Sequence, residues 1–372
     1  MGTGQQLAAH YAKNDVIVIG GGVIGLSIAR ELAGRKSVLL LDRGSTGQGT
    51  SRAAAGMLSP LSEADDQGAF FQLCRAGHAL YGGFVDELQA ETGLDVGYST
   101  EGLLCLASSE EAADVLRRRY DWQRKAGFEV ELISSGGVHE MEPLVTAPIA
   151  AAAFMPGERS VTPRRLVNAL REACFSRGVE MRTGLRVEGI SGNAVHVGRM
   201  RLEASSIVIA SGVWSAEFAG LNPPIPVYPR KGQILSLGMP AGAFRRMIRW
   251  GSSYFVPRSA GDLVVGATNE DAGFDLSNTP AGLGRLLNDA QQISSHVGCY
   301  PILETWTGLR PATPDGLPIL GPSSIPGVYY ATGHYRNGVL LAPITASIVA
   351  DLIDNQRPSI SIEPYLPSRF SK

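Results

Sequence analysis

The chain has 372 residues, a length that favours two domains over one. Hydrophobic residues make up 44% of it and charged residues 18%, a balance that excludes an intrinsically disordered protein. The net charge of −2 and the lack of a basic run give no reason to expect a nucleic-acid-binding protein.

The N-terminal stretch and the cysteines favour a protein of the reducing cytoplasm. Residues 1–13 lack the apolar core of a signal peptide, and no run of 18 apolar residues predicts a transmembrane helix. Cys74, Cys105, Cys174 and Cys299 have neither C-x-x-C spacing nor a neighbouring His at ligand spacing. We therefore expect reduced thiols, no metal site and a cytoplasmic location.

The first predicted unit is a strand, a glycine turn, a helix and a second strand. Residues 16–19 (V-I-V-I) have the continuous apolar composition of a buried parallel strand. A helix is expected over 23–33, and the strand at 37–41 ends in Asp42. This order predicts a dinucleotide-binding unit.

The glycine pattern gives each glycine a role in that unit. Gly20 allows the tight turn, Gly22 lets a pyrophosphate approach the backbone, and Gly25 lets the helix pack on the strand. The N–H groups at the start of the helix favour phosphate, and Asp42 stands where a ribose hydroxyl would be. The pattern does not distinguish FAD from NAD.

A run of small residues follows at 49–58 (G-T-S-R-A-A-A-G-M-L). Small side chains let the backbone lie under a ring or a phosphate, and Thr50 and Ser51 can donate hydroxyls to such a ligand. A solvent loop of low bulk explains the run equally well.

The remaining elements are read from apolar periodicity and from helix caps. Helices are expected over 70–92, 110–126, 163–178, 280–297 and 338–354, and strands over 102–107, 179–183, 206–210, 233–237, 254–256, 263–266 and 328–331. We predict an α/β fold with a discontinuous nucleotide-binding domain (14–85, 150–225 and 305–358), an antiparallel substrate domain (86–149 and 226–304) and tails at 1–13 and 359–372.

Two arginines and one tyrosine stand out in the C-terminal half. Arg310 lies in G-L-R-P, Arg336 lies in the glycine-bounded G-H-Y-R-N-G, and Tyr254 lies in a strand. A guanidinium fork matches a carboxylate with two parallel hydrogen bonds, so the pair predicts a site for a small carboxylate. The competing interpretations are surface ion pairs for the arginines and a half-buried strand aromatic for Tyr254.

These pieces carry a family resemblance over nearly the whole chain. The chain resembles the D-amino-acid oxidase-like FAD oxidoreductases, and within them the glycine oxidases of the ThiO type. The matching segments are V-I-V-I-G-G-G-V-I-G, T-S-R-A-A-A-G-M-L, V-I-A-S-G-V-W-S, Y-F-V-P-R, L-V-V-G-A-T, G-L-R-P-A-T-P-D-G-L-P-I-L-G and G-H-Y-R-N-G-V-L-L-A-P. Asp42 stands where many relatives have Glu.

The resemblance implies a Rossmann-like FAD-binding domain of the glutathione-reductase type and a second, antiparallel substrate domain. It assigns Arg310 and Arg336 to the substrate carboxylate, Tyr254 to a hydroxyl beside them, and Met57 to the border of the substrate. The residues implied to contact FAD, together with the glycine turn, are Gly20, Gly22, Val23, Ile24, Gly25, Asp42, Arg43, Thr50, Ser51, Ala55, Gly56, Met57, Val187, His334, Tyr335, Arg336, Asn337, Gly338, Val339 and Leu340.

The segment G-L-R-P-A-T-P-D-G contains no Cys, so we expect FAD to be bound without a covalent link. The helix that begins near Gly338 would direct its positive end at the flavin and raise its electron affinity. No acid–base residue is expected at the substrate carbon, and His334 is expected to be a structural or a flavin-neighbouring residue rather than a catalyst.

The function implied is the oxidation of glycine, or of sarcosine or D-alanine, to the imine and glyoxylate, with O2 reduced to H2O2, in the supply of thiazole for thiamine. The alternatives are a related D-amino-acid or sarcosine oxidase or dehydrogenase, and a flavin-binding protein without turnover. The expected partners are a small amino acid and O2, and the family resemblance implies a homo-oligomer, specifically a tetramer.

Overall fold

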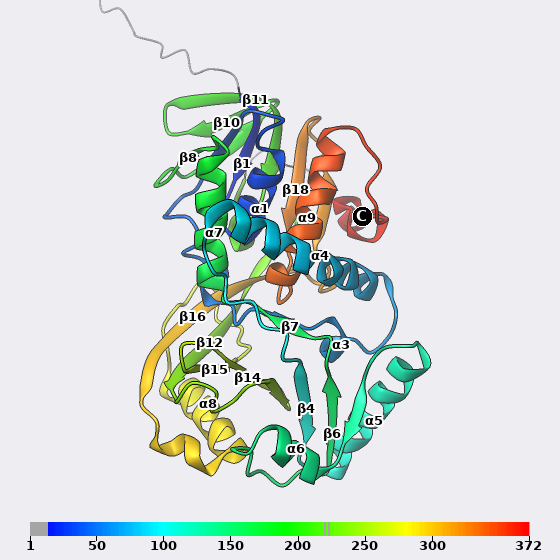
Figure 1. Ribbon diagram of the computed structural model, residues 1–372. Coiled ribbons are helices and arrows are strands. Elements are labelled where there is room, and N and C mark those ends of the chain that lie inside the picture. Colours follow the sequence, from blue (N-terminus) through cyan, green and yellow to red (C-terminus); the bar gives the residue numbers. More distant parts are fainter. Residues whose placement is uncertain (1–13, 219–220, 222–223, 372) are drawn as a thin grey trace, which may run out of the picture.

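The computed structural model describes residues 14–218, 221 and 224–371. The expected N-terminal tail, residues 1–13, lies outside this described part. Two large sheets, one above the other in Figure 1, organise the described chain, and helices pack against both of them. None of the described helices is both long and apolar enough to cross a membrane.

The first sheet is built around β1, and β2 and β11 run parallel to it on either side. Its strand order is β17-β18-β11-β1-β2-β8, and a β9–β10 hairpin extends from β11. Its strands are β1 (Asn14–Ile19), β2 (Val38–Leu41), β8 (Glu180–Arg182), β9 (Gly189–Ser191), β10 (Ala194–Val197), β11 (Met200–Ile209), β17 (Ile319–Pro322) and β18 (Val328–Thr332).

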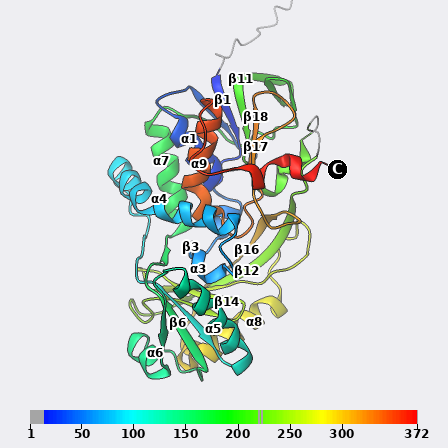
Figure 2. The same ribbon diagram turned by 90° about the vertical axis from the view of Figure 1, so that its right-hand side faces the viewer.

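Both faces of this sheet are buried, which explains the continuous apolar runs in its strands. Side chains alternate along a strand, so Val16 and Val18 pack toward one core while Ile17 and Ile19 pack toward the other. Helices supply the first of these cores: α1 (Val23–Leu32), α4 (Ala69–Thr92), α7 (Pro163–Ser176) and α9 (Gly338–Ile353). Figure 2 shows these helices together on one side of the sheet.

A proline inside α9 is accommodated by its neighbour α4. Pro343 has no N–H to donate to the carbonyl of Val339, and the Tyr81 hydroxyl donates to that oxygen instead at 3.1 Å. The two helices also approach closely at Gly77, where a Cβ would stand 2.7 Å from the carbonyl oxygen of Leu340. The start of α9 is therefore held by α4 from one side.

The second sheet has the order β16-β12-β15-β14-β13-β4-β6-β5 and is antiparallel apart from the β13–β4 pair. Its strands are β4 (Leu103–Ala107), β5 (Glu131–Ile133), β6 (Ala151–Met155), β12 (Tyr228–Gly238), β13 (Met247–Trp250), β14 (Ser253–Pro257), β15 (Asp262–Gly266) and β16 (Ile302–Ala312). One face packs against α6 (Ser135–Met141) and α8 (Pro280–Ile293). The other packs against α5 (Glu110–Lys125) and against Ala55, Met57 and Leu61.

Short elements fill the space between the two sheets. The run of small residues at 49–58 forms α2 (Thr50–Ala53) and β3 (Met57–Leu58), and α3 (Pro60–Glu63) follows it. β3 pairs with β7 (Arg159–Ser160); β7 lies between the two sheets in Figure 1, and β3 lies between them in Figure 2. The described part of the connection from β11 to β12 includes a 3-10 turn, η1 (Gly212–Glu217).

Several limits of the expected domain layout differ from the structure. α4 continues past residue 85, where we expected the first nucleotide-binding segment to end, and Val85 and Leu88 belong to the helix-side core of the first sheet. The segment from 359, expected as a tail, contains the buried Tyr365, whose hydroxyl donates to the carbonyl of Ala69 at 2.7 Å. It forms two 3-10 turns, η3 (Glu363–Tyr365) and η4 (Pro367–Phe370), beside β17. The nucleotide-binding segments expected to begin at 150 and at 305 also start differently, because β6 and β16 pair with strands of the second sheet. The remaining domain limits stay a prediction.

Candidate active site

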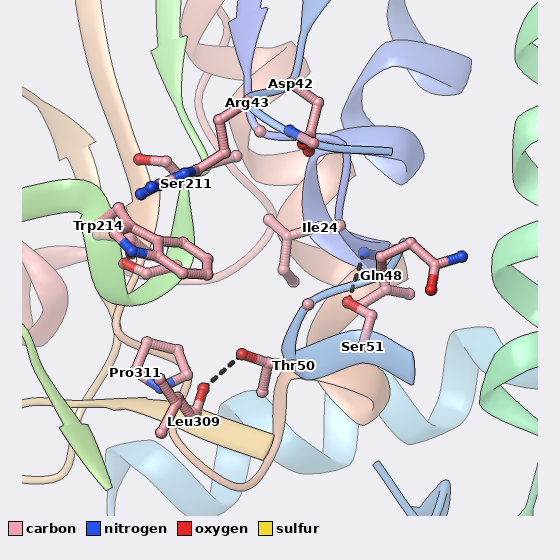
Figure 3. A pocket seen from close by; sticks show the side chains of 18 of the residues that line it. Ile24, Asp42, Arg43, Gln48, Thr50, Ser51, Ser211, Trp214, Leu309 and Pro311 are labelled. Carbon is pink, nitrogen blue, oxygen red and sulfur yellow. Dashed lines mark hydrogen bonds between the residues drawn. The ribbon is translucent and has the colours of Figure 1, made fainter. Parts of the chain in front are cut away.

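A cavity of about 420 Å³ lies where β1, β2 and β11 end and the two sheets meet. Figure 3 shows side chains from several distant segments pointing into it, among them Asp42, Thr50, Trp214 and Pro311. In a parallel sheet of this kind, ligands bind at the carboxyl ends of the strands. The cavity therefore occupies the position that the glycine pattern predicts.

The glycine turn is fixed by contacts that leave no room for side chains. Gly20 has a φ of +110°, and a Cβ there would stand 2.4 Å from the carbonyl oxygen of Ala210. A Cβ on Gly25 would stand 1.8 Å from the carbonyl oxygen of Gly20, so Gly25 lets α1 pack directly on the turn. Gly22 caps α1 without a side chain and lines the cavity, which leaves the positive end of the helix facing the ligand space.

The acid at the end of β2 is held by the backbone on both sides. The Gly21 N–H donates to Asp42 Oδ2 at 2.6 Å, and the Gly44 N–H donates to Oδ1 at 2.7 Å. Each carboxylate oxygen still has a second lone pair, and Asp42 lines the cavity. Its orientation is thus set before a ribose hydroxyl binds.

The hydroxyl groups of Thr50 and Ser51 hold together the segments that form one wall of the cavity. The Val23 N–H donates to Ser51 Oγ at 2.9 Å, so Ser51 supports the start of α1. Thr50 Oγ1 donates to the carbonyl oxygen of Leu309 on β16, which ties α2 to the second sheet (Figure 3). Of the two interpretations of the small-residue run, a ligand-lining segment is the one consistent with these contacts.

Arg43 and Trp214 form the far wall of the cavity. The Arg43 guanidinium lies 4.7 Å from the centre of the Trp214 ring, which in turn stacks on Phe274 at 6.4 Å. Val187 and Leu276 also line the cavity. Aromatic and apolar surface at this end suits a flat adenine ring.

The loop before α9 closes the opposite end. Tyr335 has a φ of 47°, and its N–H donates to the carbonyl of Pro311 at 2.9 Å. His334 is buried and its Nε2 lies 3.0 Å from Thr345 Oγ1. Burial lowers the pKa of His334 to about 3, so its ring is neutral at physiological pH. His334 is thus a neutral ring beside Thr345, and its role toward FAD stays a prediction.

These features fit FAD. The turn presents backbone to a pyrophosphate, Asp42 presents a carboxylate to a ribose, and the open end of α9 at Gly338 faces the cavity. The N-cap residue of α9 is Asn337, whose side chain makes no capping hydrogen bond. The positive end of this helix favours negative charge beside it.

A second, smaller cavity of about 80 Å³ adjoins the first. Thr50, Ala54, Gly308 and Tyr335 line both cavities, so a ligand in one borders a ligand in the other. The polar side chains that line the small cavity include Arg310, Arg336 and Tyr254, the three residues singled out in the sequence. The fold thus brings two strands and one loop from distant parts of the chain to a single small pocket: Tyr254 lies in β14, Arg310 in β16 and Arg336 in the loop before α9.

Arg310 lies flat on the backbone of the neighbouring strand. A Cβ on Gly232 would stand 2.4 to 2.6 Å from three atoms of the Arg310 guanidinium. Arg310 Nη1 donates to the carbonyl of Thr268 at 3.1 Å and, more weakly, to that of Lys231 at 3.4 Å. These contacts fix the plane of the guanidinium, which is the condition for a bidentate hydrogen bond to a carboxylate.

Tyr254 is positioned by a second glycine. It pairs with Gly266 across β14 and β15, and a Cβ on Gly266 would stand 2.5 Å from the Tyr254 hydroxyl. Burial raises the pKa of Tyr254, and the charges of Arg310 and Arg336 act in the opposite direction. The hydroxyl is therefore protonated at physiological pH and can donate a hydrogen bond to a carboxylate.

Arg336 is engaged by an acid that the sequence did not single out. Arg336 Nη2 lies 3.0 Å from Glu63 Oε1, and Arg249 Nη1 lies 2.8 Å from the same oxygen. Burial acts to raise the pKa of Glu63, but the two guanidiniums outweigh it and hold the pKa below its usual range. Glu63 is thus an anion that bridges the loop before α9 and strand β13.

The predicted cofactor residues fall into three groups. Those that line the large cavity are Gly20, Gly22, Val23, Ile24, Asp42, Arg43, Thr50, Ser51, Val187, His334, Tyr335, Gly338 and Val339. Ala55 and Arg336 line the small one. Gly25, Gly56, Met57, Asn337 and Leu340 are not among the lining residues of either cavity.

Three members of the last group have other surroundings in the structure. Gly56 packs against Val161, whose carbonyl would stand 2.1 Å from a Cβ. Leu340 is buried in the helix-side core, and Met57 packs on the second sheet. The individual roles of all these side chains toward FAD and substrate stay predictions.

Sequence reasoning missed several residues of the two cavities. Trp214 lies in the quoted segment V-I-A-S-G-V-W-S, so its motif was seen although the side chain was not named. Gly266, which contacts Tyr254 from outside the cavity lining, lies in the quoted segment L-V-V-G-A-T. Gly232 of the small cavity, and Glu63 and Arg249 beside it, gave no local signal, because each acquires its role from a partner on another strand or loop.

Known proteins share both the sequence and this architecture. The family model described as FAD dependent oxidoreductase (DAO) matches residues 15–352. The chain is 37% identical over 368 residues to the bifunctional protein ThiO/ThiG of Nostoc sp. strain PCC 7120, a match that covers 96% of this chain and 55% of that protein. The chain thus spans about half the length of these bifunctional relatives.

Single-function relatives match end to end. The glycine oxidase of Geobacillus kaustophilus strain HTA426 is 35% identical over 366 residues, with 96% of this chain and 97% of that protein covered. A crystal structure of glycine oxidase from Geobacillus kaustophilus superposes with a TM-score of 0.93 at 34% identity, over 96% of this chain and 99% of the other. The predicted family, fold and FAD cofactor are thereby confirmed, and the chain belongs to the FAD dependent oxidoreductase family.

Proposed function

We propose that this protein oxidises glycine, and more slowly other small amines such as sarcosine or D-alanine, to the imine, and that this imine serves thiazole formation in thiamine synthesis. The observation that carries the proposal is the convergence of Arg310, Arg336 and Tyr254 in a small cavity that adjoins the FAD cavity. Similarity to glycine oxidases and to ThiO/ThiG proteins supports the choice of substrate and pathway.

The two arginines and the tyrosine orient the substrate through its carboxylate. Arg310, fixed on Gly232, offers a bidentate donor, Arg336 adds a second cation, and the Tyr254 hydroxyl adds a third donor. Each charge-assisted hydrogen bond contributes about 1.5–3 kcal/mol. Held in this way, the α-carbon of a small amino acid faces the wall that the two cavities share, and orientation supplies much of the rate.

FAD, when bound, would accept two electrons from the amine and transfer these electrons to O2, which would be reduced to H2O2. Glycine loses two electrons and two protons overall and becomes the imine, which water converts to glyoxylate and ammonia. The lone pair of the neutral amine drives the loss of the α-hydrogen, so no protein base is needed at the carbon. Burial keeps His334 neutral, and its bond to Thr345 gives it a structural role.

The size of the small cavity supports small substrates. Its volume of about 80 Å³ is walled by the backbone and methyl groups of Ala53, Ala54 and Ala55 and by Ile234. A bulky side chain on the α-carbon has no space to enter without displacing these residues. Glycine and amines with one added methyl group suit this volume.

Two measurements test the proposal. Bleaching of the flavin absorbance on anaerobic addition of glycine would support it, and an unchanged spectrum would favour a flavin-binding protein without turnover. Oxygen uptake with glycine, sarcosine and D-alanine then ranks the substrates. Dye reduction without peroxide from any of the three would identify a dehydrogenase that passes its electrons to another carrier.

A further inference from the structure

Glu63 stands between two arginines, of which Arg336 lines the small cavity and Arg249 lies behind it. Its Oε1 lies 3.0 Å from Arg336 Nη2 and 2.8 Å from Arg249 Nη1. The proposed carboxylate clamp uses Arg336 but has no role for Arg249. A carboxylate that is shared by two guanidiniums next to a pocket for carboxylates calls for a functional explanation.

Buried hydrogen bonds to the backbone of α3, the short helix that carries Glu63, fix the position of Glu63. The Leu61 N–H donates to Glu158 Oε1 at 2.8 Å, and Gln123 Nε2 donates to the Leu61 carbonyl at 2.8 Å. Glu158 and Gln123 are both buried. Because α3 is anchored from both sides at Leu61, the carboxylate of Glu63 is held at one place.

Arg249 faces the same side of the second sheet as Tyr254. The two residues are paired across β13 and β14, so their side chains leave the same face. The side chains of Arg249 and Glu63 are only 17% and 30% exposed, and that of Arg336 is 31% exposed. Charges in such partly desolvated positions interact more strongly than charges in water.

We propose that Glu63 is the charge-selectivity determinant of the substrate pocket. Arg249 and Arg336 together form a second carboxylate site beside the clamp, and Glu63 is its permanent occupant. A substrate with one carboxylate binds on Arg310 and Arg336 without disturbing this pair. A substrate with a second acidic group, such as D-aspartate, meets the fixed negative charge of Glu63 and is rejected, because like charges placed together are unfavourable. This inference rests on the proposed carboxylate clamp.

The test compares two ligands that differ in one charge. Malonate carries two carboxylates, and malonamate, its monoamide, has nearly the same shape and carries one. Their dissociation constants for the FAD-loaded protein are measured from the change in the flavin spectrum, without turnover. The Glu63→Gln variant keeps the size of the side chain and removes its charge. In this variant the dissociation constant of malonate divided by that of malonamate should fall at least tenfold, which corresponds to about 1.4 kcal/mol.

Two further variants separate charge from structure. Glu63→Asp keeps the negative charge and should keep the wild-type ratio. The double variant Glu63→Gln, Arg249→Gln should lose the gain in malonate binding, because the cation that receives the second carboxylate is gone. Flavin content and thermal unfolding of each variant show whether it is folded.

The outcomes distinguish the role of Glu63 from the carboxylate clamp on which it rests. An unchanged ratio in Glu63→Gln, or an equal gain in the double variant, would overturn the role of Glu63 while leaving the clamp intact. If neither ligand alters the flavin spectrum of any variant or of the wild type, the clamp itself is wrong and the inference falls with it. Glycine turnover is measured separately and does not enter the ratio.

Discussion

The carboxylate clamp makes its strongest prediction at Arg310. Arg310→Ala removes a guanidinium that lies against Gly232 and donates to the carbonyl of Thr268. Its guanidinium also lines the small cavity, where a substrate carboxylate would bind. We expect the KM for glycine to rise and the flavin content to stay as in the wild type, because Arg310 does not line the large cavity.

The size of the effect follows from the loss of a bidentate, partly desolvated contact. Breaking one partner of a buried charge pair costs about 2–5 kcal/mol. Since each 1.4 kcal/mol is a factor of ten, the KM should rise roughly 30-fold to several thousand-fold. Arg336 and Tyr254 keep some affinity, so the loss should not be complete.

The assay is oxygen uptake over a wide range of glycine concentration, with the flavin content read from the visible spectrum of the same sample. Arg230→Ala is the matched control. Arg230 pairs directly with Arg310 across β12 and β16, but its guanidinium faces Asp271 at 3.7 Å and Asn269 at 3.3 Å. The assignment would be falsified by near-normal glycine kinetics in Arg310→Ala, or by loss of FAD together with activity.

Three further predictions test the site and the structure around it. Gly232→Ala should displace the Arg310 guanidinium and raise the KM for glycine by a factor equivalent to about 1–3 kcal/mol, without loss of FAD. Gly284→Ala is the control: a Cβ there meets nothing within 4 Å, so neither the KM nor the FAD content should change. Asp42→Ala should weaken FAD binding, measured as flavin lost on dialysis, and flavin retention equal to wild type would argue against Asp42 as the ribose ligand. Burial raises the pKa of Glu158 from 4.5 to about 8, so its contribution to stability is complete below pH 4.5 and is lost as the pH rises through 8. Glu158→Gln should abolish this loss, worth roughly 5 kcal/mol, and unfold at a higher temperature than wild type at pH 9; equal pH profiles of the unfolding temperature would contradict it.

Contiguous patterns made the nucleotide-binding half predictable. The apolar run at 16–19, three glycines and Asp42 lie within one βαβ unit, and the structure places them as the pattern requires. Each of these residues acts through neighbours on the same or the adjacent element. Gly20 and Gly25 illustrate this, because the close approach that excludes a side chain involves the turn and the strand beside it.

The small cavity was only half predictable. Arg310, Arg336 and Tyr254 stood out because unusual glycine-bounded segments and a strand motif carried them. Glu63 did not stand out, because it meets Arg336 across a separation of 273 residues. A short acidic helix end has no local feature that distinguishes it from a solvated one.

The sequence by itself therefore determined the family, the cofactor and the types of side chain that bind the substrate, since these depend on residue identity within continuous motifs. Only the tertiary structure decided how those side chains are held and which others join them. Strand register set Gly232 beneath Arg310, and it set Gly266 beneath Tyr254 and Arg249 beside it. The approach of the two sheets brought Glu63 to Arg336 and Arg249. Register and the approach of the sheets arise from the packing of the whole chain, and no local pattern encodes them.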